Sequence, residues 1–360
     1  MKFRNRTLFF LLATLATLAS WRLADASDFQ LEKQKLKFSF EYESFIDPFR
    51  NEVITPGLKA NYLLKGKSKV GKSAILHFDY QSGLKTNLHT SFEAGELARL
   101  LWSNRLNTSF TIPFGKCYAG TNFFLRHKWV SESSNQFVDI FGGLGFRDVQ
   151  SGVYFGVFPY PNLEVIVSAV ASDVNFNHFE DSNSRSKGGS LRISRRLERL
   201  KINLDYRIKK IDFNRPIFFE SSEGKLEQKD DFQEIGLTVE LLQPFYVSGG
   251  YAYQTNDSNN PGFSYKNHRF SLLMGTDFGE DFHLQAYGIA QRQDFEQSVQ
   301  LLLPVFLEDS DYDTMGVSLI GTINDSMELE VGAQRLNHNS SFRELDASKF
   351  ILFAALNFRF

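Results

Sequence analysis

The last twelve residues of the chain, 349–360, carry the pattern that most limits what this sequence can fold into. Every second residue counted back from the C-terminus is apolar: Phe360, Phe358, Leu356, Ala354, Leu352 and Phe350. A period of two is that of a β-strand with one apolar face. At the edge of a soluble sheet such a strand promotes aggregation, whereas a closed membrane barrel leaves no free edge. The segment therefore predicts the closing strand of a transmembrane barrel.

The same alternation recurs from about residue 36 onwards, in segments of roughly ten residues that have the length and pattern of barrel strands. Leu106–Phe114 and Leu200–Ile208 are two clear examples. Nothing in the middle of the 360 residues has the composition of a linker, so the sequence predicts one domain. No later apolar stretch reaches about 18 residues, which excludes transmembrane helices.

The N-terminus has the pattern of a secretory signal peptide. Three basic residues precede an apolar stretch at 8–19, and Ala24-Asp25-Ala26 matches the A-x-A cleavage pattern. We therefore predict a cleaved signal peptide at 1–26 and a barrel domain at 27–360.

Charge and cysteine content exclude other classes of protein. Removal of residues 1–26 leaves 36 basic and 41 acidic residues, so no global basic excess indicates a nucleic-acid partner. The single cysteine, Cys117, cannot form an internal disulfide and is too far from the predicted cleavage site to carry a lipid. An exported chain without disulfides is then either a soluble β-protein or a membrane β-barrel.

The connections between the predicted strands alternate between short and long. Tight turns are predicted at 197–198, 243–244, 279–280 and 324–325, and long polar connections at 173–187, 211–230, 255–264, 293–311 and 337–348. Short turns at one end and long loops at the other are typical of outer-membrane barrels. The pattern predicts an all-β, transmembrane, antiparallel, up-and-down barrel with short periplasmic turns and long extracellular loops.

The strand count depends on two ambiguous regions. After a strand predicted at 138–146, we count sixteen strands in total if 151–172 is one long strand bent at Pro159 and Pro161, although prolines are rare within strands. Fourteen or eighteen strands remain open. The segment 83–102 is predicted as a loop with a short helix. Aromatic residues at strand ends predict interfacial girdles, the alternative being that they are simply good strand formers.

By these features the chain resembles the outer-membrane β-barrel, or porin-like, proteins of Gram-negative bacteria. Phe358 and Phe360 match the C-terminal pattern of that family, and the resemblance implies that they form the signal read by the barrel-insertion machinery. It also implies a location in the cell outer membrane, among its lipid and lipopolysaccharide. The likeness covers the whole predicted mature chain but is architectural, and it identifies no particular transporter.

Motifs that would carry catalysis or bind metals are weak. The segment 66–73 matches the phosphate-binding pattern G-x-x-x-x-G-K-S, but an alternating strand follows it where that site needs a helix. Asp309, Asp311 and Asp313 are spaced as in a calcium loop, but Thr314 and Ile320 replace the required glycine and glutamate. No G-x-S-x-G or H-E-x-x-H pattern is present. We therefore predict no enzyme activity, no cofactor and no metal.

The lumen is the remaining candidate site. On the face opposite the apolar row at 200–208 we predict basic pore-lining residues, joined by two from the preceding strand: Arg192, Arg196, Lys201, Arg207 and Lys209. Glu328 and Glu330 are predicted roughly across from them, although Glu240 beside the basic wall weakens the contrast. Facing basic and acidic walls would set a transverse field in a water-filled pore.

The sequence favours a porin-like passive channel for small polar solutes. The alternatives are an export or assembly barrel for a polysaccharide or surface protein, a barrel-embedded hydrolase and a soluble secreted β-protein. The apolar segment 301–307 is the predicted plug or contact site within the long connections. Oligomeric state is left open.

Overall fold

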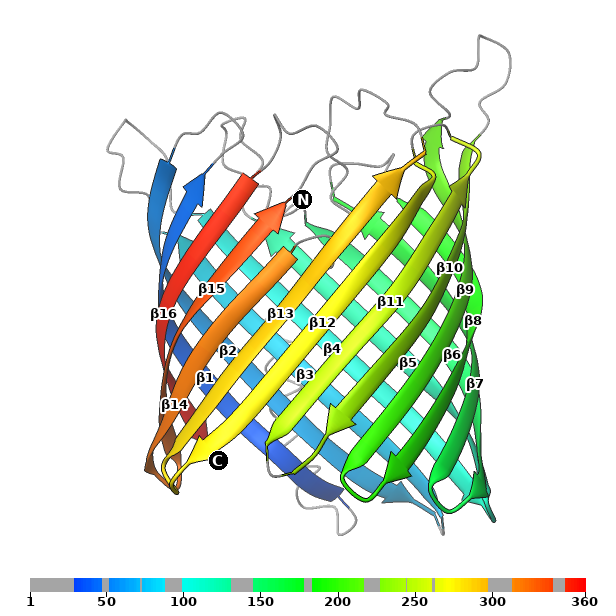
Figure 1. Cartoon of the computed structure of the whole chain (residues 1–360), viewed down its shortest axis with the longest axis horizontal. Helices are drawn as coiled ribbons and strands as arrows, with labels where there is room; N and C mark the ends of the chain where they lie inside the picture. The colour runs from blue at the N-terminus through cyan, green and yellow to red at the C-terminus, as the bar shows by residue number, and fades with distance from the viewer. Residues whose placement is uncertain are drawn as a thin grey trace, which may run out of the picture.

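The computed structural model describes residues 29–46, 52–71, 73–87, 99–130, 145–177, 183–216, 227–243, 245–260, 263–296, 313–338 and 347–360. These residues form one closed, antiparallel barrel in which each strand pairs with its neighbours in sequence and β1 pairs with β16 (Figure 1). The predicted fold class is confirmed, as is the count of sixteen strands. None of the described residues belongs to a helix long and apolar enough to span a membrane.

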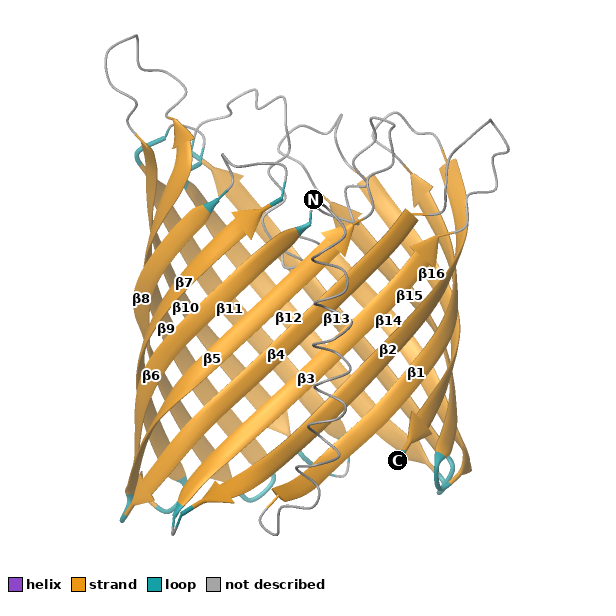
Figure 2. Ribbon diagram, turned by 180° about the vertical axis from the view of Figure 1, so that it is seen from behind, coloured by secondary structure: helices purple, strands orange, loops and turns teal. Residues whose placement is uncertain are grey.

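The strands are between 12 and 19 residues long and are tilted against the barrel axis (Figure 2). Their bounds are β1 Phe29–Ile46, β2 Glu52–Val70, β3 Ala74–Asn87, β4 Arg99–Phe114, β5 Cys117–Val130, β6 Phe146–Tyr160, β7 Leu163–Phe176, β8 Ser184–Leu197, β9 Leu200–Pro216, β10 Glu227–Leu241, β11 Tyr246–Ser258, β12 Tyr265–Phe278, β13 Phe282–Phe295, β14 Asp313–Asn324, β15 Met327–His338 and β16 Ala347–Arg359.

The connections are sorted by length between the two ends of the barrel, as predicted. All turns from an even-numbered strand to the next strand are short and lie at one end, which we call the short-turn end (Figure 2). Three of them contain a glycine with positive φ: Gly71 at 65°, Gly115 at 63° and Gly279 at 67°. The opposite end, which we call the loop end, carries the longer connections. The phosphate-binding match at 66–73 lies in the end of β2 and the turn after it, so its helix is absent.

Two predicted strand assignments are wrong. Pro161 and Asn162 form a turn that separates β6 from β7, so residues 151–172 are parts of two strands rather than one bent strand. The turn explains the proline, whose missing N–H has no ladder partner to lose there. The segment 83–102 is strand at both ends, since β3 continues to Asn87 and β4 starts at Arg99. The rest of the predicted loop and short helix, 88–98, lies outside the described residues. The predicted strand at 138–146 lies outside the described residues except for its end, where Phe146 starts β6.

The strands also extend further into the predicted long connections than the sequence pattern indicated. Asp173 belongs to β7 and Arg185 to β8, where the two side chains form an ion pair across the ladder, 3.2 Å apart. The outward-facing row, apolar at Val167 on β7 and Leu191 on β8, is polar at Asp173 and Arg185, while the backbone pairing continues. The strands therefore project beyond the apolar band.

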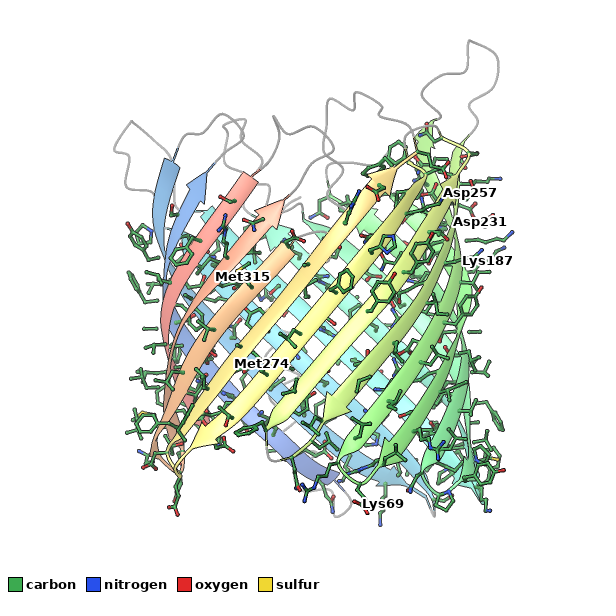
Figure 3. All side chains as sticks on the ribbon, in the orientation of Figure 1. Lys69, Lys187, Asp231, Asp257, Met274 and Met315 are labelled. Carbon is green, nitrogen blue, oxygen red and sulfur yellow. The ribbon has the colours of Figure 1, made fainter. Side chains whose placement is uncertain are left out.

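The side chains alternate in environment along each strand. On β16, Leu352 and Leu356 are exposed, whereas Ala355 and Asn357 are buried. Among the described residues, six apolar side chains are buried against seventeen polar or charged ones. This is the reverse of a soluble protein, whose core is apolar. The outer face is therefore suited to lipid, and the labelled Met274 and Met315 are exposed on it (Figure 3). The inner face, which we define as the face opposite the exposed apolar rows, is polar.

Exposed aromatic side chains gather near the strand ends. Phe278, Phe282 and Phe360 are 54%, 52% and 73% exposed at the short-turn end. Trp102 and Trp129 are direct partners on β4 and β5 towards the loop end. Both positions fit the interfacial girdles predicted from sequence. Other exposed rings, such as Phe270, lie further along their strands, so strand propensity also contributes to the aromatic content.

Candidate functional site on the inner face of the barrel

The five basic side chains predicted to line the pore share one face of β8 and β9. Arg192 is directly opposite Asp205, and Arg196 is opposite Lys201 in the ladder between these strands. Leu204, Tyr206 and Ile208 alternate with them and are exposed on the outer face. The list of predicted basic residues on this wall is Arg192, Arg196, Lys201, Arg207 and Lys209.

Acidic residues neutralise much of this wall. Arg192 Nε lies 2.7 Å from Asp205 Oδ1, and Lys201 Nζ lies 3.2 Å from Glu240 Oε1. Asn203 also donates to the same Glu240 oxygen, at 3.0 Å. The wall is therefore a ladder of ion pairs that crosses β8, β9 and β10, with fewer uncompensated charges than the sequence suggests.

Two basic residues of this wall, Arg207 and Lys209, lie nearer the loop end of the barrel than the other three. Arg207 Nη1 lies 3.5 Å from Glu234 Oε1, with almost half of the arginine side chain exposed. Lys209 is opposite Phe232, so its immediate cross-strand neighbour carries no charge. Within the described part of the chain, no carboxylate lies within salt-bridge distance of Lys209.

The predicted acidic wall on β15 is also paired. Lys35 Nζ lies 3.3 Å from Glu328 Oε2, and Lys37 Nζ lies 2.8 Å from Glu330 Oε2. Both contacts reach from β1 to β15 across the intervening strand β16. Arg359 of β16 also donates to Glu328. In the closed strand order β15 lies nearly opposite β8 and β9, as predicted, but each wall contains its own counter-charges.

Sequence reasoning missed a third charged cluster, at the loop end of β1, β3 and β16. Glu43 is 1% exposed and contacts both Lys85 of β3 and Lys349 of β16, the latter at 2.9 Å. Lys85 Nζ also lies 2.9 Å from Glu41, and Lys59 Nζ lies 3.5 Å from Glu41. The alternation of β1 places Glu41 and Glu43 on the polar face, but it does not identify their partners, which come from three other strands, β2, β3 and β16.

A cluster of buried polar side chains around Asp230 lies at the loop end of β10 and β11. Asp230 accepts hydrogen bonds from Gln228 Nε2 and from Asn256 Nδ2, both at 2.9 Å. Asn260 donates to Gln228 Oε1 at 2.9 Å, and both amides are fully buried. Asn256 also donates to the backbone carbonyl of Phe263. These bonds hold the connection between β11 and β12 against the end of β10.

No metal-binding group of three or more His, Cys, Asp or Glu residues is found in the described ranges. Of the calcium-like aspartates, only Asp313 is described; it starts β14 and accepts a hydrogen bond from the backbone N–H of Gln291 at 2.7 Å. Asp309, Asp311 and the predicted plug at 301–307 lie outside the described residues, as does the predicted signal peptide.

The closed antiparallel order, the apolar outer face and the charged inner face together define an outer-membrane-type β-barrel. No family model matches the sequence, and no curated protein matches it. Among solved structures, the chain is similar to the outer-membrane protein OmpT of Vibrio cholerae, with 10% identity and a TM-score of 0.46 over 93% of this chain and 100% of that one.

Two further structures show the same likeness. A mutant of the TodX monoaromatic hydrocarbon channel is 9% identical with a TM-score of 0.44, over 92% of this chain and 90% of that one. A triple mutant of the Rhodopseudomonas blastica porin is 10% identical with a TM-score of 0.35, over 92% of this chain and 100% of that one. The similarity to these porins and channels lies in barrel architecture.

Proposed function

We propose that the protein is a passive, porin-like channel for small polar solutes in the outer membrane of a Gram-negative bacterium. The observation that carries this proposal is a closed barrel of sixteen strands whose inner face is charged and whose outer face is apolar. Barrels of about 16–18 strands are wide enough to enclose an aqueous channel. The many ion pairs on the inner wall support the same function, because charges tolerate burial there only with partners or water.

In this proposal the two charged walls line the pore and tune which ions and solutes pass. Among the residues that the structure describes, Arg196 and Lys209 of the basic wall have no ion-pair partner, and the acidic residues Glu328 and Glu330 are held by ion pairs on the opposite side. Phe358 and Phe360 serve as the barrel-insertion signal, and residues 1–26 direct export. Catalysis forms no part of the proposed function.

Single-channel recording in planar lipid bilayers tests the proposal. We expect steady, ohmic conductance steps from the purified protein. Silence in every preparation that shows heat-modifiable migration on a gel would contradict a passive channel and favour a plugged export barrel or a barrel-embedded enzyme.

The location has its own test. Carbonate-resistant association with the outer membrane is expected for the wild-type chain, and Phe360→Ala should lower the amount of inserted protein. Extraction of the wild-type chain by carbonate would contradict a membrane location and favour a secreted soluble protein.

A further inference from the structure

The short-turn mouth of the barrel carries two directly opposed pairs of like charges. Lys33 of β1 is the ladder partner of Lys65 of β2, and Lys35 of β1 is the ladder partner of Arg359 of β16. Directly opposed side chains on antiparallel strands lie about 5 Å apart at Cβ, and like charges there are destabilising. Four cations therefore share one inner surface on three adjacent strands.

The acidic residues near this cluster do not balance it. Glu328 contacts both Lys35 and Arg359 and so offsets one charge between two cations. Asp79 lies 2.7 Å from Lys65 Nζ. Within the described part of the chain, Lys33 has no carboxylate at salt-bridge distance; the charged groups acting on it are Lys35, Lys65, Arg359 and Glu328.

The surrounding inner surface is also basic. Towards the short-turn end the inner faces of β1 and β2 carry five lysines, at positions 33, 35, 37, 65 and 67. No acidic residue lies in the same inward-facing rows of these two strands at this end. Glu32, at the bulge between Leu31 and Lys33, lies 3.1 Å from Lys67 and pairs with no other cation of the described ranges. Lys69 adds a further exposed cation at the same end (Figure 3).

We propose that Lys33, Lys35, Lys65 and Arg359 form a binding site for a small multiply charged oxyanion at the short-turn mouth. This inference rests on the proposed function and names anionic phosphates or carboxylates as the solute class of the channel. The two opposed pairs present excess positive charge over a surface that spans three strands, which suits a ligand with at least two negative groups. Such a ligand relieves the repulsion within both pairs and accepts charge-assisted hydrogen bonds from them.

Isothermal titration calorimetry with sodium pyrophosphate tests the site on the detergent-purified protein at low ionic strength. We expect saturable binding that weakens as salt is added. Lys33→Gln with Lys65→Gln should weaken it about tenfold or more, because each lost charge-assisted hydrogen bond contributes substantially to affinity. Malonate in place of pyrophosphate distinguishes a general oxyanion site from one that takes phosphate alone.

The matched control is Lys187→Gln with Lys210→Gln. These two lysines are also direct ladder partners, on β8 and β9. They lie on the outer face of the barrel, in the rows of the exposed Leu191 and Ile208 (Figure 3 labels Lys187). The control removes the same formal charge and should leave pyrophosphate binding unchanged. Heat-modifiable migration verifies that each variant is folded, and Lys33→Gln alone serves if the double variant does not fold, because Lys33 holds no ion pair in the described structure.

The outcomes separate this inference from the proposed function. Absence of saturable binding in the folded wild-type protein, or equal weakening in both double variants, overturns the site even if the barrel conducts. Saturable binding that is lost only in the Lys33 and Lys65 variant supports the site even if bilayer recordings are silent, in which case only the passive channel is refuted.

Discussion

Substitution of Glu43 tests how much the buried charges of the inner wall contribute to the stability of the barrel. Its carboxylate is 1% exposed and joins two strands that are not neighbours of each other, β3 through Lys85 and β16 through Lys349. Glu43→Gln keeps the shape and some of the hydrogen bonding while it removes the charge.

The structure sets the size of the expected effect. Glu43 lies 2.9 Å from Lys349 Nζ, and a contact of that length gives about 5–6 kcal/mol of attraction at an effective dielectric constant of about 20. This attraction offsets a desolvation cost of several kcal/mol for each ion. Without the carboxylate, Lys349 remains buried with that cost uncompensated, whereas Lys85 keeps its contact with Glu41. We expect a loss of about 3 kcal/mol, the lower end of the range for breaking a buried pair.

Urea-dependent unfolding in lipid vesicles measures this loss. Two of the three tryptophans of the chain, Trp102 and Trp129, are on the barrel, and their fluorescence reports transfer between lipid and water. The control is Lys59→Gln, which breaks a longer contact of 3.5 Å involving a lysine that is 39% exposed. That variant should lose less than about 1 kcal/mol, as exposed pairs do.

A double-mutant cycle completes the test. Glu43→Gln combined with Lys349→Gln removes both charges, so the double variant should be more stable than the sum of the single effects predicts, by about 1–3 kcal/mol. A loss below about 1 kcal/mol for Glu43→Gln, or strictly additive effects in the cycle, would refute the argument that this wall is desolvated.

Three further predictions concern selectivity and backbone packing. Arg207→Glu with Lys209→Glu should lower the anion-to-cation permeability ratio in bilayer recordings made under a salt gradient; an unchanged reversal potential would exclude these residues from the conduction path. Gly316→Ala should cost about 1–3 kcal/mol, since a Cβ there would lie 2.6 Å from the Tyr287 ring, and Tyr287→Ala in the same chain should restore most of it in vesicle unfolding; no rescue would point to backbone strain instead. Gly279→Ala should cost about 1 kcal/mol, because its φ is 67° and nothing lies within 4 Å of the added Cβ; a neutral effect would mean that the turn relaxes.

The barrel could be predicted because lipid requires apolar side chains at every second position of each strand, and this alternation is visible in the sequence. Alternation at 200–208 and 350–358 identified the exposed rows correctly, since a strand in lipid must expose one apolar row and bury its backbone polar groups. The strand count was also right, but its assignment was not, because Pro161 was interpreted as a bend within a strand rather than as part of a turn.

The charge pairing of the lumen could not be predicted in the same way. Sequence alternation places Glu41, Glu43 and Glu328 on the inner face, yet their partners lie across one or two strand widths. Lys37 reaches Glu330 over a sequence separation of 293 residues, and no local pattern encodes such a contact. Barrel tilt and register decide these pairs, and both depend on the closure of the whole sheet.

The pairing of β1 with β16 closes the barrel, and it determines when the barrel can become stable in a membrane. Twelve residue pairs, from Lys35 with Arg359 to Ile46 with Ser348, join the first strand to the last. While the last strand is still being synthesised, the first has no partner for that edge, and hydrocarbon offers its backbone no hydrogen bonds. A chain that lacks β16 therefore leaves two open edges in the bilayer, so β16 is a condition for stable insertion.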